Sequence, residues 1–177
     1  GRLDKAMSAL PVDVERNDRD PGMMALAGQV YILHGDVDRA QRYFARASSL
    51  DPEDPAKRTS LAVSRLASGQ RDAALGELQS IAASDDGVVA DMALINALRQ
   101  ERKVDQALNT IDALEKKRPA DVMPVFLRGR ALLLQRDAVG ARKALERVLE
   151  IDPHYFPAFG VLSAPANADK PPADASR

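Results

Sequence analysis

Small and large apolar residues recur along the chain with a period of about 34 positions. The easiest position to follow is an alanine with a large apolar residue four positions later, as in Ala40 and Phe44 or Ala141 and Leu145. Apolar residues four apart lie on one face of a helix. The alanines are Ala6, Ala40, Ala74, Ala107, Ala141 and Ala175, at successive spacings of 34, 34, 33, 34 and 34. A fixed period in this range predicts an array of structural repeats.

Helix start and stop signals divide each period into two helices. Asp20-Pro21 pairs a capping carboxylate with a proline in the first helical turn, which is a strong start signal. Gly35 supplies the left-handed conformation that ends a helix, and Asp36 then caps the next one. The same signals recur at Asp54-Pro55, Gly69 and Asp137. Alternating β-branched runs are nearly absent, so the sequence predicts an all-α chain.

The period and the order of the marked positions are those of the tetratricopeptide repeat (TPR). A small residue in the first helix, such as Gly28 or Gly129, allows the second helix to approach closely. Neither helix of a repeat can bury its apolar face alone, so the prediction is a right-handed superhelical solenoid of αα-hairpins. The predicted repeats span 21–54, 55–87, 88–121 and 122–155; a partial repeat with only its second helix spans 1–20, and a partial repeat with a loosely ordered tail spans 156–177.

Both ends of the array lack a complete repeat. Leu3 to Val14 resembles a second helix without its first, and Tyr155 to Ala164 opens a first helix that would leave Phe156 and Phe159 half covered. Terminal repeats of solenoids normally carry a polar outer face. We therefore expect a piece of a longer protein. The alternative is a complete four-repeat protein with frayed ends.

The composition argues against most kinds of catalytic, metal-binding and nucleic-acid-binding site. The chain has no cysteine and two histidines, which argues against disulfides, thiol nucleophiles and multi-histidine metal sites. Its 25 basic and 26 acidic residues give a net charge of −1, unlike a nucleic-acid-binding protein. Neither His34 nor His154 has a catalytic partner in the pattern, and no phosphate-binding glycine loop or run long enough to span a bilayer appears. We predict no catalytic residue, no metal site and no cofactor.

The remaining candidate site is the concave groove, which in TPR arrays is lined by the first helices. Asn96 could bond the backbone of a bound peptide, and Arg99 and Arg130 could clamp a carboxylate. Met92 and Phe126 could supply apolar pockets beside them. The alternative is that both arginines are solvated or paired with nearby acids. The full set of groove candidates is Gln29, Met92, Asn96, Arg99, Phe126 and Arg130.

Several phrases resemble the TPR lipoproteins that accompany the PEP-CTERM/exosortase protein-sorting system (PrsT-like proteins). They are Arg65 to Gly69, Ala113 to Lys117, Leu127 to Gly129, Gly140 to Pro153 and Tyr155 to Ala158. The resemblance implies a non-catalytic scaffold linked to exopolysaccharide production in Gram-negative bacteria. It also implies a periplasmic or outer-membrane-associated location, with membrane contact only through a lipid anchor outside this chain.

Other functions stay open on the sequence. The chain could be a cytoplasmic TPR adaptor or co-chaperone, although Ala25 and Gln29 replace the lysine and asparagine of the chaperone-tail clamp. It could also support an enzyme domain elsewhere in a longer chain. Direct polysaccharide binding is weakened by the absence of tryptophan. We expect a monomer, or a crystal dimer through the cut ends near Leu3 and Phe159.

Overall fold

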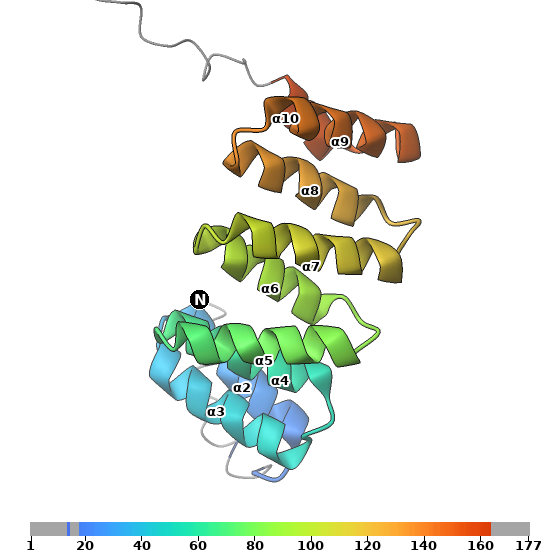
Figure 1. Cartoon of the computed structure of the whole chain (residues 1–177). Coiled ribbons are helices and arrows are strands. Elements are labelled where there is room, and N and C mark those ends of the chain that lie inside the picture. The colour runs from blue at the N-terminus through green and yellow to red at the C-terminus, as the bar shows by residue number, and fades with distance from the viewer. Residues whose placement is uncertain (1–13, 15–17, 164–177) are drawn as a thin grey trace, which may run out of the picture. The chain divides into compact units, whose positions relative to one another are not determined.

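The computed structural model describes Val14 and residues 18–163, and the regular structure in this part of the chain is entirely helical (Figure 1). The predicted all-α fold of consecutive helical hairpins is confirmed. The helices are α2 (Pro21–His34), α3 (Val37–Leu50), α4 (Pro55–Ala67), α5 (Arg71–Ser84), α6 (Val89–Gln100), α7 (Val104–Lys117), α8 (Val122–Leu134), α9 (Ala138–Ile151) and α10 (Phe156–Leu162).

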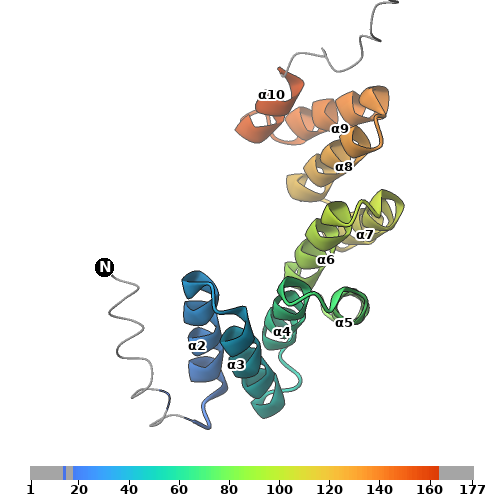
Figure 2. The same ribbon diagram turned by 90° about the vertical axis from the view of Figure 1, so that its left-hand side faces the viewer.

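The chain forms two compact units, with the boundary inside α7 between Thr110 and Ile111. In the first unit each helix packs against the next from α2 to α6, and α4 also contacts α6. Figure 2 shows α2, α3 and α4 running side by side. In the second unit α8 packs on α9, and α10 packs on α9. Each unit therefore has its own core.

The turn between the two helices of a pair is closed by a left-handed residue. Gly35 has φ 86° and Gly69 has φ 87°, as predicted for these two glycines. The Gly35 amide donates to the Ile32 carbonyl at 3.0 Å, and the next amide donates to the Tyr31 carbonyl at 2.9 Å. These bonds satisfy carbonyls that the end of α2 leaves free.

The later turns keep this geometry without glycine. Arg102 has φ 56° and Arg136 has φ 63°, at the positions that correspond to Gly69 one and two repeats later. A residue with a β-carbon pays a conformational cost in this region. At these two positions the fold therefore keeps the turn with arginine in place of glycine.

Aspartate caps begin most of the helices that the sequence marked. The Asp20 carboxylate accepts from the amides of Gly22 (2.7 Å) and Met23 (3.1 Å). The other predicted caps are confirmed as well: Asp36 accepts from Arg39, Asp54 from Ala56 and Lys57, and Asp137 from Gly140. By contrast, Gln70 before α5 and Val88 before α6 give no side-chain cap bond.

Two glycines allow the closest approaches between paired helices. A β-carbon built at Gly28 would lie 2.6 Å from the Phe44 ring, and one at Gly129 would lie 2.9 Å from Leu145 Cγ. Phe44 and Leu145 are 4% and 2% exposed. The predicted role of both glycines in close helix packing is therefore confirmed.

The ends of the predicted array fall largely outside the described residues. Of the predicted helix at 3–14 only Val14 is described, and the tail from 164 on is not described. On α10, Phe156 is 76% exposed and Phe159 47% exposed, which agrees with the half-covered helix expected there. The first helices of the predicted repeats begin at Pro21, Pro55, Val89, Val122 and Phe156.

The left-handed turns predict that replacing glycine lowers the stability of the chain and that introducing glycine raises it. Gly35→Ala should lower the free energy of unfolding by about 1 kcal/mol, because alanine resists positive φ. Arg136→Gly should raise it by about 0.5 kcal/mol or more, since glycine removes that cost. Urea unfolding followed by circular dichroism measures both.

Gly76 provides the matched control. It lies in the middle of α5 with no neighbouring heavy atom within 4 Å of an added β-carbon. Gly76→Ala should therefore stabilise the chain by about 0.5–1 kcal/mol. If Gly35→Ala and Gly76→Ala shift the unfolding midpoint in the same direction, the account of the turn is wrong.

Candidate functional site

An apolar groove lies on the first helices of the hairpins in the first unit. It has a volume of about 580 Å³ and draws its walls from α2, α4 and α6, with Phe44 of α3. Three large apolar side chains on it are well exposed: Leu33 (73%), Val89 (59%) and Val63 (42%). The lining residues are Gln29, Ile32, Leu33, Phe44, Thr59, Ser60, Val63, Ser64, Ala67, Val89 and Ala93. Exposed apolar side chains grouped in one hollow are typical of a binding surface.

A more polar hollow continues the groove between α4 and α6. Its volume is about 420 Å³, and it shares Val63, Ala67 and Ala93 with the apolar part. Its far side is formed by Asn96 and Gln100 and by an ion pair in which Arg71 Nε lies 2.7 Å from Glu101 Oε1. The shared residues make the two hollows one surface, apolar over α2 and polar toward the end of α6. We call this surface the first-helix groove.

Thr59 places an unsatisfied hydroxyl at the wall of this groove. The residue is 4% exposed, and its Oγ1 has no hydrogen-bond partner among the described residues. The neighbouring buried Ser64 differs, because its Oγ donates to the Leu61 carbonyl at 2.7 Å. A buried hydroxyl without a partner costs free energy. The Thr59 hydroxyl is thus a polar group in an apolar surface, and it makes no hydrogen bond with the described residues.

The groove candidates of the first unit fall on or beside this surface. Gln29 is exposed and lines the apolar part, and Asn96 is exposed and lines the polar part. The Asn96 side-chain oxygen accepts a hydrogen bond from Arg99 Nη1 at 3.3 Å. Met92 and Arg99 are half-buried on α6. Asn96 and Arg99 thus act as a pair, one turn apart on the same helix.

The two remaining candidates belong to the second unit and form a small cluster there. Phe126 is 7% exposed and meets the Tyr155 ring edge-on, with 5.2 Å between ring centroids. The exposed Arg130 guanidinium stands 5.8 Å from the Phe126 centroid, a cation–π distance. Burial raises the pKa of the Tyr155 hydroxyl above its ordinary value. Arg130 makes no ion pair with another described residue, so its guanidinium donors face solvent.

The described residues show neither a metal-binding cluster nor a membrane-spanning helix. His34 and His154 are both exposed, and no group of three His, Asp or Glu side chains could hold a metal ion there. None of the described helices is long and apolar enough to cross a membrane. The arrangement offers apolar area, amide groups and guanidinium groups, which are means of binding a peptide.

The repeat register in the sequence places Leu33, Val63 and Val89 among the groove positions and predicts a groove that is apolar toward one end, but the six candidates singled out there do not include them. Leu33, Val63 and Val89 lie on the first helices at positions that face the groove, but nothing local separates an exposed valine from a buried one. The same register places Thr59 in the groove, but it does not show that the hydroxyl has no partner. Its missing partner becomes visible only when its neighbours are placed.

The unsatisfied hydroxyl predicts a stabilising substitution. Thr59→Val keeps the shape of the side chain and removes the buried polar group, so the free energy of unfolding should rise by about 1 kcal/mol. Ser64→Ala is the control: it removes a hydroxyl that has a partner, and should leave stability unchanged or lower it by about 1 kcal/mol. Thermal and urea unfolding compare the two. A destabilised Thr59→Val protein would show that the hydroxyl is satisfied within the fold.

Comparison with known proteins agrees with the helical pattern. Two family models, both described as tetratricopeptide repeat, match residues 31–91 and 92–156. No curated protein matches the sequence. YrrB, described as a TPR protein with an unusual peptide-binding site, is similar in structure with a TM-score of 0.66 and 19% identity, over 91% of this chain and 84% of that one.

Other solved structures are similar to the same degree. MamA from Desulfovibrio magneticus matches with a TM-score of 0.68 and 19% identity, over 86% of this chain and 87% of that one. A thermophilic TPR protein of Thermus thermophilus matches with a TM-score of 0.61 and 22% identity, over 75% of each chain. At these identities the likeness concerns the fold alone.

Proposed function

The chain belongs to the tetratricopeptide repeat family, and from this premise we propose that it is a non-catalytic scaffold that binds a segment of a partner protein in the first-helix groove. The observation that carries the proposal is the exposure of Leu33, Val63 and Val89 around one hollow of about 580 Å³. Apolar surface held in water stabilises any complex that covers it, by about 25 cal/mol for each Å² of apolar area buried.

The polar end of the groove defines the rest of the ligand. The side-chain amide of Asn96 can bond a peptide backbone, and the Arg99 guanidinium beside it donates a hydrogen bond to the Asn96 oxygen. The best occupant is a peptide with large apolar side chains over α2 and α4 and with polar or acidic groups toward the end of α6.

A photo-crosslinking amino acid in the groove tests the proposal in the native host. Placed at Val63 of the full-length protein, it should capture a partner protein that the same group at Ser80 does not. Ser80 is the matched control because it is exposed on α5, outside the groove. Leu33→Ala with Val89→Ala should lower recovery at least about tenfold, because a hot spot loses about 1.4 kcal/mol or more.

The arginines are tested separately in the same experiment, because Arg99 belongs to the first unit and Arg130 to the second. Arg99→Ala should weaken capture of a partner that carries a carboxylate on the bound segment, because the guanidinium loses a charge-assisted bond. If this variant stays folded and recovers the partner at the wild-type level, Arg99 does not orient the ligand. Arg130→Ala tests the second unit in the same way. Equal crosslinking from Val63 and Ser80 would contradict the groove as the binding surface.

We propose further that the full-length protein works in the bacterial envelope, beside exosortase-linked protein sorting and exopolysaccharide production. Support comes from the phrases that resemble the PrsT-like lipoproteins, among them Gly140 to Pro153. In that setting the scaffold would hold export or polymer-synthesis proteins together, and its lipid anchor would lie outside this chain.

Cell fractionation and affinity purification distinguish this setting from a cytosolic one. The full-length protein should appear with the membrane fraction and be recovered with envelope export or polysaccharide-synthesis proteins. A cytosolic marker protein of the host, followed through the same fractions, is the fractionation control. Recovery with cytosolic chaperones would instead support a cytoplasmic adaptor and refute the envelope proposal.

A further inference from the structure

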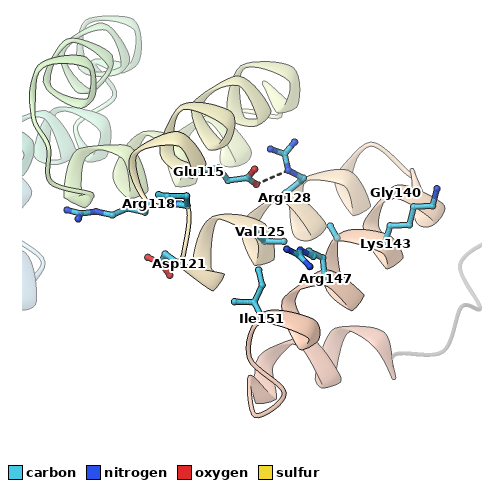
Figure 3. Close-up of a pocket in the computed structure, with 11 residues that line it drawn as sticks. Glu115, Arg118, Asp121, Val125, Arg128, Gly140, Lys143, Arg147 and Ile151 are labelled. Carbon is cyan, nitrogen blue, oxygen red and sulfur yellow. Dashed lines mark hydrogen bonds and ion pairs between the residues drawn. The ribbon is translucent and has the colours of Figure 1, made fainter.

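The second unit has a pocket between α7, α8 and α9 that the first-helix groove does not include (Figure 3). It encloses about 540 Å³ between the end of α7, the middle of α8 and one side of α9. Its lining residues are Glu115, Arg118, Pro119, Asp121, Val125, Arg128, Gly140, Lys143, Ala144, Arg147 and Ile151. We call it the α7–α9 pocket.

The floor of the α7–α9 pocket is apolar. Val125 and Ile151 face it from α8 and α9, and both are half-buried (Figure 3). Gly140 and Ala144, one turn apart on α9, leave space because neither carries a long side chain. The floor can therefore accept an apolar side chain from outside.

The wall around this floor carries more basic than acidic side chains, and the acidic ones are already engaged. Four lining residues are basic and two are acidic. The Glu115 carboxylate is engaged by Arg128, whose Nε lies 2.9 Å from Glu115 Oε1, and Arg128 also pairs with Asp112. These bonds raise the pKa of the Arg128 guanidinium above its ordinary value. The other acid, Asp121, caps α8 through the Met123 amide at 2.9 Å. Both acids thus already have partners within the unit.

Two cations on α9 remain accessible to a ligand. Lys143 is exposed and makes no ion pair with another described residue. Arg147, one turn later, pairs with Glu150 at 2.7 Å, but both side chains are more than 60% exposed, at 63% and 64%. An exposed pair of this kind contributes only about 0–1 kcal/mol, so an incoming carboxylate can replace Glu150 at little cost. The pocket therefore presents two exchangeable positive charges beside an apolar floor.

We propose that the α7–α9 pocket binds an acidic segment of a partner protein, in which a large apolar side chain enters between Val125 and Ile151 while flanking carboxylates bond Lys143 and Arg147. The charge of the wall selects for carboxylates, and the apolar floor selects for a neighbouring leucine or phenylalanine. A bare inorganic anion would leave that floor uncovered. This second surface is formed by different residues from the first-helix groove, so the scaffold would hold two segments at once.

Synthetic peptides of matched length test the proposal on the full chain. One alternates Glu and Leu; the second replaces each Glu by Gln, and the third replaces each Leu by Ser. The first should bind at least about tenfold more tightly than either of the others, because each contact type supplies about 1.4 kcal/mol or more. Fluorescence anisotropy measures the affinities, and NMR amide shifts should locate the first peptide around Ala144 and Arg147.

Charge-reversal variants distinguish binding in the α7–α9 pocket from non-specific electrostatic attraction to the protein. Lys143→Glu with Arg147→Glu should lower the affinity for the Glu–Leu peptide at least about tenfold. Lys116→Glu with Arg142→Glu is the control, because it changes the net charge by the same amount at exposed residues outside the pocket. At an ionic strength that screens long-range attraction, it should change the affinity for the peptide less than about twofold. Circular dichroism verifies that both variants are folded.

Three results would overturn the proposal. The first is no binding of the Glu–Leu peptide, or binding equal to that of the Gln peptide. The second is equal weakening by both charge-reversal variants, which would reveal non-specific attraction. The third is a set of amide shifts confined to the first-helix groove around Val63 and Asn96; that outcome would leave the proposed groove function standing and remove only the second site.

Discussion

Close contact between a glycine of one helix and a large side chain of its partner is the constraint on which each unit depends. Phe44 rests against Gly28 in the first unit, and Leu145 rests against Gly129 in the second. Any β-carbon at either glycine would displace the ring or the leucine, and overpacking of this kind costs about 1–3 kcal/mol. The contact sets how near the two helices of a hairpin lie. That distance in turn sets how the next first helix packs, and so where the groove residues point.

The sequence predicted the hairpins well because their signals are local. Asp20, Gly35 and Asp137 act on backbone groups within three or four residues, so their positions in the chain are enough to assign their roles. The left-handed arginines at 102 and 136 were not predicted, because glycine was the only signal considered for such a turn. There the geometry comes from the packing of the flanking helices rather than from the residue itself.

The candidate surfaces were less predictable for a physical reason: their chemistry depends on contacts between distant residues. Arg128 meets Glu115 across 13 positions and Asp112 across 16, and no period in the sequence marks these partners. Asn96 and Arg99 were expected to act on a ligand, and the structure shows that they also bond each other. For Phe126 and Arg130 the structure adds a cation–π contact. Whether these candidates bind a peptide stays a prediction.

The turns closed by Arg102 and Arg136 have a consequence for how such an array can change. Since the backbone keeps its course there with a long charged side chain as well as with glycine, the residue at this position is released from any structural duty beyond tolerating positive φ. The turns at 102 and 136 are then places where a different side chain can be displayed to solvent while the backbone keeps its course.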